Sequence, residues 1–388
     1  MKKLVLLAAI VPACSWGQFD DLSDSTPARA EEKPDGVKAS DYGIGVVGAT
    51  VPSNTSGGTI AVLSAGPGNF STLELDPGGK DQNLGDSESL LPHTIDSLSN
   101  AATLLFDGVG SIALVDNSNS GTIIAVTGNT SGLTVDTQVG TPAHPTATAF
   151  ANGELVVAVD STMTVPSNVF SVKGTAVVNC TLNDNAGMPL VAAALAIDGT
   201  KLWAYAKSGA FFGYDLAALD MPSTCINLAP TSAVAMAGPA MNGGHIDVIP
   251  GKFAIVTAFD TNVTTTGQVQ VVATSPAVAV VGTPMAAPGV HSAAFANLPD
   301  KGMVVLGYPN RADTTTTGAG AVDLHTIAVD TGVLDGLPAQ TLTIPGAETN
   351  HLFGRSVATT NYNGKPIVVA SASNTVYSYY ATALYEKR

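Results

Sequence analysis

The sequence predicts an all-β protein, a seven-bladed β-propeller made of repeats of about fifty residues. The composition is the first indication: 40 Gly and 23 Pro among 388 residues, with only 12% charged residues, are typical of a chain rich in strands and turns. The second is a series of short apolar runs separated by Gly, Asn, Asp and Pro. The third is that these runs recur in units, without any long helical periodicity. Tandem β-sandwiches are the structural alternative, which would require longer units with independent cores.

A turn between two apolar runs marks each unit. It recurs as FDGVGSIALV, FANGELVVAV, AIDGTKLWAY, VIPGKFAIVT, NLPDKGMVVL and NYNGKPIVVA. The turn glycines follow one another at intervals of 45 to 62 residues: Gly108, Gly153, Gly199, Gly251, Gly302 and Gly364. Residues 190–197 (LVAAALAI) lead into one of these turns. We interpret that short apolar segment as a buried strand rather than a helix.

A third apolar run follows in each unit and usually begins near Gly or Asn. It recurs as GGTIAVLSA, SGTIIAVTG, SNVFSVKG, GAFFGYDL, TGQVQVVAT, GAGAVDLHTIAV and NTVYSYYA. The first copy is preceded by DYGIGVVGATVP, which matches the strand after the turn in the other units. Seven copies predict seven blades, and we assign the propeller to residues 40–388.

The N-terminus, MKKLVLLAAIVPACSWGQ, predicts a secretory signal. Lys2 and Lys3 precede an apolar run that is too short to cross a bilayer. The residues Val11-Pro12-Ala13-Cys14 resemble a bacterial lipobox, so residues 1–14 are interpreted as a signal peptide with Cys14 as the lipidated residue. An ordinary signal peptide with an incidental cysteine is the alternative.

The segment after Cys14 predicts a flexible tether. Residues 15–39 are polar, rich in charge and contain Pro. Ser15 rather than Asp follows the cysteine, and by resemblance to enterobacterial lipoproteins this favours the outer membrane. We therefore expect an outer-membrane lipoprotein that is exposed at the surface or faces the periplasm.

The charge balance excludes one class of partner. The formal net charge is −15, so the chain has no basic surface with which to bind nucleic acid. The same excess disfavours electrostatic docking on anionic lipid, which leaves the lipid anchor as the membrane contact. It is compatible with an exposed protein that must remain soluble.

Cys180 and Cys225 are the two cysteines of the predicted propeller. In an oxidising compartment such a pair suggests a disulfide. They lie 45 residues apart, about one repeat, and equivalent positions on neighbouring units are often too far apart for an S–S bond. Two separate buried thiols therefore remain the alternative.

The segment FGRSVATTNYNGKPIVVASAS resembles the FG-GAP repeat of integrin α-chain propellers and related bacterial surface proteins. The matching residues are Phe353-Gly354 for the Phe-Gly element, Val47-Gly48-Ala49 with Pro52 and Leu306-Gly307-Tyr308-Pro309 for the Gly-Ala-Pro-like element, and Gly57-Gly58 and Gly318-Ala319-Gly320 for the start of the third strand. The match covers most of residues 41–388 and is good in the first, sixth and seventh units. The resemblance implies a seven-bladed propeller that binds partners, often with calcium in the first hairpin.

The turns nevertheless disfavour calcium, and we expect no cofactor. A calcium loop needs several oxygen ligands at alternate positions, whereas each turn here has at most one or two oxygen-bearing side chains. Asp107, Asp198 and Asp300 are interpreted as residues that form turns. Asn361 and Asn363 are the first pair to test for weak binding, although neutral amides are poor ligands.

Four histidines stand shortly before the first strand of a unit: His144, His245, His291 and His351. First strands line the central channel of a propeller, so their starts meet at one mouth. Converging imidazoles could bind a ligand or a metal there, or respond to pH. Solvated loop histidines at unrelated heights are the alternative, and we assign no metal ligand.

No catalytic motif is present: G-x-S-x-G, C-x-x-C and H-E-x-x-H are all missing from the sequence. The aromatic groups Trp203, Tyr205, Phe211, Phe212 and Tyr214, and Tyr377, Tyr379 and Tyr380, are interpreted as packing residues. The Thr-rich segments DTNVTTTG and RADTTTTGAG predict exposed contact loops.

The leading functional hypothesis is a non-enzymatic, lipid-anchored propeller on the cell surface. It would bind a protein or glycan through loops on one face, as an adhesin or as a component of an envelope complex. A propeller enzyme, a hydrolase or lyase with its site at the channel mouth, is the second hypothesis. A purely structural envelope protein is the third.

Overall fold

The computed structural model describes the chain between residues 36 and 380, with gaps. Up to residue 140 the described residues are those of the strands named below. Beyond it they are residues 145–159, 168–174, 176–222, 225–261, 265–298, 300–312, 316–344, 349–362, 365–372 and 375–380. The predicted signal peptide with Cys14 lies outside this part of the chain.

The described strands form seven four-stranded antiparallel sheets, which we number in chain order. Sheet one contains β2 (Val46–Val51), β3 (Thr59–Leu63), β4 (Asn69–Glu74) and β5 (Leu90–Thr94). Sheet two contains β6 (Thr103–Phe106), β7 (Ile112–Val115), β8 (Thr122–Asn129) and β9 (Gly132–Gly140). Sheet three contains β10 (Pro145–Ala151), β11 (Glu154–Val159), β12 (Val169–Lys173) and β13 (Ala176–Cys180). Sheet four contains β14 (Ala192–Asp198), β15 (Lys201–Ala206), β16 (Ala210–Asp215) and β17 (Ser232–Ala235).

Sheets five and six follow the same pattern, whereas sheet seven includes one strand from the other end of the chain. Sheet five contains β18 (Gly243–Ile249), β19 (Phe253–Phe259), β20 (Gly267–Ala273) and β21 (Ala279–Ala286). Sheet six contains β22 (Ser292–Asn297), β23 (Gly302–Tyr308), β24 (Ala321–Ile327) and β25 (Gln340–Leu342). Sheet seven contains β26 (Val357–Tyr362), β27 (Lys365–Ser371), β28 (Thr375–Tyr380) and, from the other end of the chain, β1 (Gly36–Lys38). Among the described residues, helical structure is limited to one short 3-10 turn, η3 (Leu216–Ala218).

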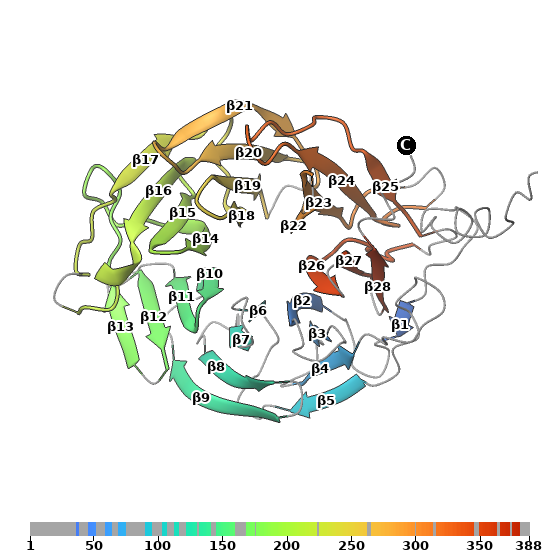
Figure 1. Ribbon diagram of the computed structural model, residues 1–388, viewed down its shortest axis with the longest axis horizontal. Helices are drawn as coiled ribbons and strands as arrows, with labels where there is room; N and C mark the ends of the chain where they lie inside the picture. The colour runs from blue at the N-terminus through green and yellow to red at the C-terminus, as the bar shows by residue number, and fades with distance from the viewer. Residues whose placement is uncertain are drawn as a thin grey trace, which may run out of the picture.

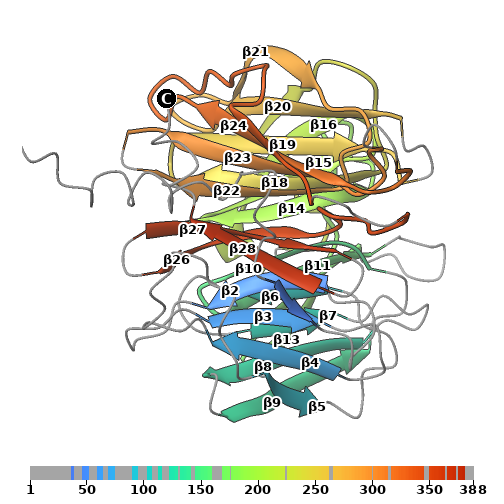
Figure 2. The ribbon, with the colours of Figure 1, turned by 90° about the vertical axis from the view of Figure 1, so that its right-hand side faces the viewer.

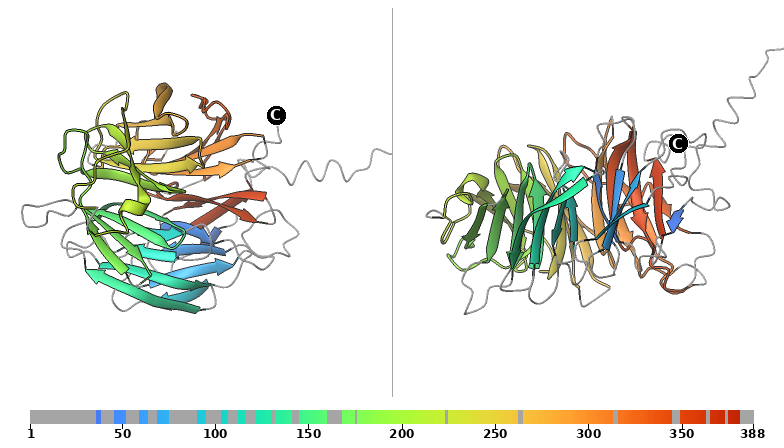
Figure 3. Two further views of the ribbon diagram at one scale, coloured as in Figure 1. Left: turned by 60° about the vertical axis from the view of Figure 1, so that its left-hand side comes forward. Right: turned by 90° about the horizontal axis from the view of Figure 1, so that it is seen from below.

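The seven sheets stand side by side in a closed circle (Figure 1). The first strand of each sheet lies nearest the centre, and the fourth lies at the rim. First strands of consecutive sheets are neighbours, from β2 and β6 through to β22 and β26, and β26 in turn neighbours β2. Figures 2 and 3 show the same ring from other sides, with the sheets standing face to face around it.

Pairing between β1 and β28 closes this circle. Gly36, Val37 and Lys38 pair with Tyr377, Val376 and Thr375. Residues 36–38 belong to the segment predicted as a tether, so the folded part of the chain begins before the predicted boundary at residue 40. Because the two ends of the ring share one sheet, backbone hydrogen bonds between them oppose its opening.

The predicted turns join first and second strands, as the described hairpins show. Between β10 and β11, Asn152 and Gly153 have φ values of 53° and 73°, the two positive values that a type I′ turn requires. One turn residue was placed wrongly: Gly302 is the first residue of β23. A Cβ at Gly302 would lie 2.5 Å from the ring of Phe295, so the packing of Phe295 is what requires glycine there.

The predicted third runs are third strands in six units: β8, β12, β16, β20, β24 and β28. The prediction for the first unit is wrong by one strand, because TIAVL forms β3, the second strand of sheet one. The run before it, VVGATV, forms the inner strand β2. Short apolar runs look alike at every position in a unit, and only their pairing partners distinguish them.

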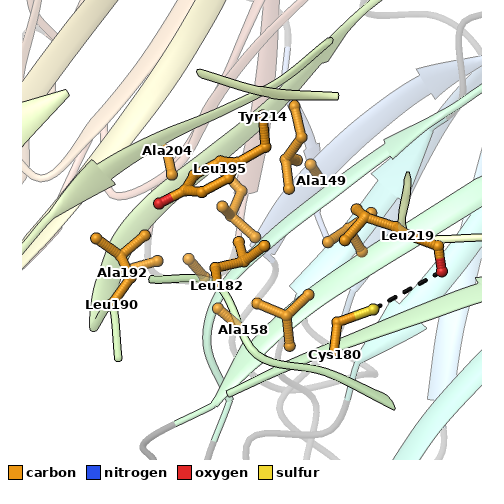
Figure 4. Close-up of a cluster of buried hydrophobic side chains, with 14 of the residues drawn as sticks. Ala149, Ala158, Cys180, Leu182, Leu190, Ala192, Leu195, Ala204, Tyr214 and Leu219 are labelled. Atoms are coloured by element: carbon orange, nitrogen blue, oxygen red, sulfur yellow. Dashed lines mark hydrogen bonds between the residues drawn. The ribbon is translucent and has the colours of Figure 1, made fainter. Parts of the chain in front are cut away.

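Neighbouring sheets share hydrophobic clusters. Figure 4 shows the cluster between sheets three and four, where Ala149 and Ala158 face Ala192, Leu195 and Ala204. Sheet four contributes its opposite face, with Trp203 and Tyr205, to a second cluster shared with sheet five. Each such sheet therefore uses both faces, which rules out separate tandem sandwiches for this part of the chain. The predicted strand at residues 190–197 corresponds to β14 in this packing, and the aromatic side chains of sheet four are buried.

Cys180 and Cys225 form a disulfide, with their Cα atoms 4.9 Å apart. The two cysteines do not occupy equivalent positions: Cys180 ends β13, whereas Cys225 lies in the long connection between β16 and β17. That connection returns across the rim of sheet three, where Thr181 donates its backbone N–H to the carbonyl of Cys225 at 2.9 Å. Because this connection folds back over sheet three, the two cysteines lie close together although they are about one repeat apart in the sequence.

Candidate functional site at the mouth of the ring

The inner strands of sheets four to seven begin on one face of the ring, which we call the mouth face. A Cβ at Gly244, near the start of β18, would lie 3.4 Å from the Cβ of Ala194, near the start of β14. Ser292 at the start of β22 donates from Oγ to the carbonyl of Gly354 at 2.9 Å, just before β26. The connections from second to third strands reach the same face. We call the opposite face, with the hairpins between first and second strands, the hairpin face.

The residues that resemble the FG-GAP motif meet at the boundary between sheets six and seven. Phe353 is fully buried, and Gly354 has a φ of 83°. A Cβ at Gly354 would lie 2.6 Å from the carbonyl oxygen of Ala321, and a Cβ at Gly320 would clash with the backbone of Phe353. The Phe-Gly bend therefore fits into sheet six through backbone contacts that only glycine permits.

His291 lies directly before β22 on the mouth face. Its ring stacks on Phe259, with centroids 5.6 Å apart and an interplanar angle of 18°. Although the residue is exposed, desolvation of its ring lowers the pKa of His291, and the positive charge of Arg355 lowers it further. Hydrogen bonds to the backbones of Arg355 and His291 oppose the shift. His291 and Arg355 are thus electrostatically coupled across two sheets.

His245 lies within β18 rather than before it, contrary to the sequence prediction. Its Nε2 is 3.3 Å from Oδ1 of Asp247, two residues along the same strand face, and 46% of its side chain is exposed. Desolvation acts to lower the pKa of His245, but the charge and hydrogen bond of Asp247 outweigh it and raise the pKa. Within the described residues, Oδ2 of Asp247 is buried and has no hydrogen-bond partner.

Two of the four predicted histidines lie on neighbouring sheets. His245 is in β18, and His291, directly before β22, stacks on Phe259, which pairs with Gly243 at the start of β18. His351 lies in the bend before β26, four residues from Arg355. His144 lies outside the described residues. In the part of the chain that the structure describes, no three His, Cys, Asp or Glu side chains come together as a metal would require.

The two Thr-rich segments flank the mouth face. DTNVTTTG follows Phe259 and leads into β20, and RADTTTTGAG leads into β24, so both join second and third strands. At the base of the second loop, Arg311 forms a bidentate pair with Asp323 at 2.8 and 2.7 Å. The Arg311 guanidinium also lies 3.8 Å from the ring centre of Tyr308. The loop therefore leaves the sheet from a fixed anchor.

In sheets three to seven the connections between first and second strands, on the hairpin face, are short, whereas third and fourth strands are joined on the same face by longer segments such as residues 216–231 between β16 and β17. Two residues join β10 to β11, β14 to β15 and β26 to β27, and three join β18 to β19. Asp198 uses its carboxylate to accept a hydrogen bond from the backbone of Gly251 at 3.0 Å, which links two neighbouring hairpins. Asn361 is a residue of β26 opposite Pro366, whereas Asp107 and Asn363 lie outside the described residues.

Sequence reasoning missed Arg355, Asp247 and the Arg311–Asp323 pair. Arg355 follows Phe353-Gly354 directly, so the motif itself could have drawn attention to it. The spacing of His245 and Asp247 places them on one side of a strand, a signal that depends on recognising the strand first. Arg311 and Asp323 are joined across a loop, and the sequence carries no mark of their pairing.

The sequence matches no protein-family model, and a search of curated proteins finds no relative. Among solved structures, the crystal structure of the computationally designed Ika8 protein is similar to this chain, with a TM-score of 0.50 and 13% sequence identity. The similarity covers 90% of this chain and 100% of that chain. At this identity it concerns the fold alone. Within the described residues, no helix has the length and apolar character needed to span a membrane.

Proposed function

We propose that the protein is a seven-bladed β-propeller that binds a protein or glycan through its mouth face. The polar loops and ionisable side chains gathered on the mouth face carry this proposal. The mouth face has both Thr-rich loops together with His245, His291 and Arg355, whereas in sheets three to seven the hairpins between first and second strands, on the opposite face, contain only two to four residues. Long polar loops on a rigid scaffold are the usual location of a binding surface.

The proposed setting is the outside of a bacterial cell. Lipidation at Cys14 would anchor the chain to the outer membrane, and the relationship to FG-GAP propellers is part of the same proposal. The disulfide between Cys180 and Cys225 supports an oxidising compartment. The folded part begins at β1 on the rim of sheet seven, so a tether of residues 15–35 would attach the ring by its rim. Such an attachment would leave the mouth face accessible to a ligand.

Site-specific photocrosslinking tests the choice of face. A benzophenone amino acid is placed at Ala312, which is exposed in the second Thr-rich loop, in the full-length protein on intact cells. The matched control carries it at Leu337, which is 84% exposed in the connection between β24 and β25, on the hairpin face. We expect a discrete crosslinked product from Ala312 and none from Leu337. Equal products from both positions, or a product from Leu337 alone, would contradict the proposal.

The His245–Asp247 pair favours a second candidate, a propeller enzyme of the hydrolase or lyase class. A carboxylate that orients an exposed imidazole is a common arrangement for general acid–base catalysis. The carboxylate raises the basicity of His245, which lies on an inner strand where a substrate in the channel could reach it. Loss of hydrolysis or elimination of a surface glycan in His245→Gln, with unchanged photocrosslinking at Ala312, would favour the enzyme. Retention of such activity in the variant would exclude His245 as its catalytic residue.

A further inference from the structure

We propose that Arg355 and His291 form a binding site for an oxyanion, the carboxylate or sulfate group of an acidic saccharide. This inference rests on the proposed function, because it assigns a ligand class to the mouth face. The site has three elements: a guanidinium that pairs with no carboxylate of the described residues, an imidazole beside it that can take up a proton, and a backbone that fixes both.

Arg355 stands out among the cations of the described chain. Of the two arginines described, Arg311 is held in a bidentate pair with Asp323. No carboxylate of the described residues pairs with the Arg355 guanidinium, and its side chain makes no hydrogen bond to them. In a protein with a net charge of −15, a partly buried arginine that no carboxylate of the described residues neutralises can bind an anionic ligand.

The backbone around Arg355 is fixed and locally strained. Leu352 has a φ of 57°, in a region that branched side chains rarely adopt. Arg355 donates its N–H to the carbonyl of Leu352 at 3.1 Å, and Gly354 donates to Ser371 at 2.8 Å. Ser292 donates to the carbonyl of Gly354, which ties the bend to the start of β22. Strain of this kind is typical of segments that position functional groups.

His291 supplies the second group. Phe259 supports one face of its ring, and the hydrogen bond from Oγ of Ser292 to the carbonyl of Gly354 holds the residue after His291 against the residue before Arg355. Desolvation of the ring lowers the pKa of His291, and the positive charge of Arg355 lowers it further because the two charges repel. An oxyanion near both groups would remove this repulsion. Among the described residues of sheet five and the loop after β19, the carboxylates Asp247 and Asp260 already have partners within the protein.

The chemistry of the surroundings favours a saccharide as the bearer of the anion. The site lies beside Thr-rich loops, whose hydroxyl groups donate and accept hydrogen bonds as sugar hydroxyls do. A guanidinium recognises carboxylate and sulfate alike through paired N–H donors. The two anions are therefore separate arms of one experiment, and a neutral sugar of the same shape is the control.

The pKa of His291, measured by NMR of its imidazole in the full-length protein, tests the proposal. Glucuronate, glucose 6-sulfate and neutral glucose are added at matched ionic strength. We expect either or both acidic sugars, and not glucose, to raise the pKa of His291 with a saturable dependence on concentration. In Arg355→Gln the pKa of His291 should be higher before any ligand is added, and affinity for the acidic sugar should fall at least about tenfold, a loss of one salt-bridged hydrogen-bond pair. Lys252→Gln, which removes a cation from the hairpin face, should behave as wild type.

Two results would overturn the inference. One is equal binding of glucose and the acidic sugars, and the other is unchanged affinity in Arg355→Gln. A peptide carboxylate that binds while both acidic sugars fail would likewise overturn the assignment to saccharides. Photocrosslinking at Ala312 separates this inference from the proposed function: a product that persists in Arg355→Gln keeps the mouth face as binding surface while the oxyanion site fails.

Discussion

Gly307 and Gly354 are in direct backbone contact across the boundary between sheets six and seven. A Cβ at Gly307 would clash with the carbonyl oxygen of Gly354 and with Oγ of Ser292. The contact brings the Phe-Gly bend of one unit against the second strand of the preceding unit, and it places Arg355 beside His291. The absence of two side chains thus determines where the candidate site lies.

Substitution of Gly307 by Ala should destabilise the protein by about 1–3 kcal/mol, the usual cost of inserting a methyl group into a closely packed interior. The nearest neighbour, the carbonyl group of Gly354, is part of the backbone and cannot move aside by changing rotamer. Gly336→Ala is the matched control, since a Cβ there would have no neighbour within 4 Å. Urea unfolding of both variants measures the difference. Equal stabilities would show that the two sheets do not pack as closely as described.

Replacing Arg311 alone should destabilise the fold more than replacing both residues of its ion pair with Asp323. Asp323 keeps only 7% of its side chain exposed, so Arg311→Met leaves a buried carboxylate with Thr341 as its remaining side-chain donor. We expect Arg311→Met to cost about 2–4 kcal/mol, and the double variant Arg311→Met/Asp323→Asn to cost less. A double-mutant cycle by denaturant unfolding measures this coupling. Additive costs would show that the pair is energetically unimportant.

Acidification should destabilise the fold through His325, which is 3% exposed. Burial lowers its pKa, as does the charge of Arg311, while a hydrogen bond to the Asp335 backbone and the charges of Asp323 and Asp335 act in the opposite direction. The unfolded chain, with a pKa of about 6.5, therefore binds a proton more readily, and stability falls as the pH drops below that value. In His325→Gln, the free energy of unfolding should depend less on pH between about 7 and 5.

His245→Gln provides the opposite control for this experiment. Because the pKa of His245 is raised in the folded state, its contribution to stability is present at low pH and is lost as the pH rises. Its removal should make the acid loss of stability steeper. Parallel pH profiles for wild type and both variants would contradict the assigned directions of the two pKa shifts.

Removal of the disulfide should cost about 2–4 kcal/mol, the usual range for a loop of this size. The bond closes a segment with a sequence separation of 45 and fixes the connection after β16 to the rim of sheet three. Cys180→Ala/Cys225→Ala and the wild type are compared by thermal unfolding without reductant. If the wild-type stability already equals that of the variant, mass spectrometry should show two free thiols and the pairing would be wrong.

Lipidation is tested independently of the fold. Radiolabelled palmitate should be incorporated into the wild-type protein in a bacterial host, and Cys14→Ala should abolish the label. Cys225→Ala is the control, because a cysteine engaged in the folded ring should not affect acylation. Label retained in Cys14→Ala would contradict the lipoprotein assignment.

The sequence by itself determined the strands, the hairpins and the approximate number of units. These features depend on local patterns: apolar runs of strand length, and Asn-Gly or Asp-Gly pairs at the turns, such as Asn152-Gly153 with its two positive φ values. It also indicated the Thr-rich loops and several of the mouth histidines. The strand TIAVL of the first unit was assigned the wrong position in its sheet, because a local pattern does not specify which strands it pairs with.

Tertiary structure alone decided how the ends meet and which side chains act together. The pairing of β1 with β28 joins residues at opposite ends of the chain, and a three-residue strand has no pattern of its own. The chain next to Arg355 lies against the chain next to His291 only because Gly307 and Gly354 allow two sheets to touch. Contacts of this kind arise from the sum of packing around the ring, whereas the sequence records only the propensities of each segment.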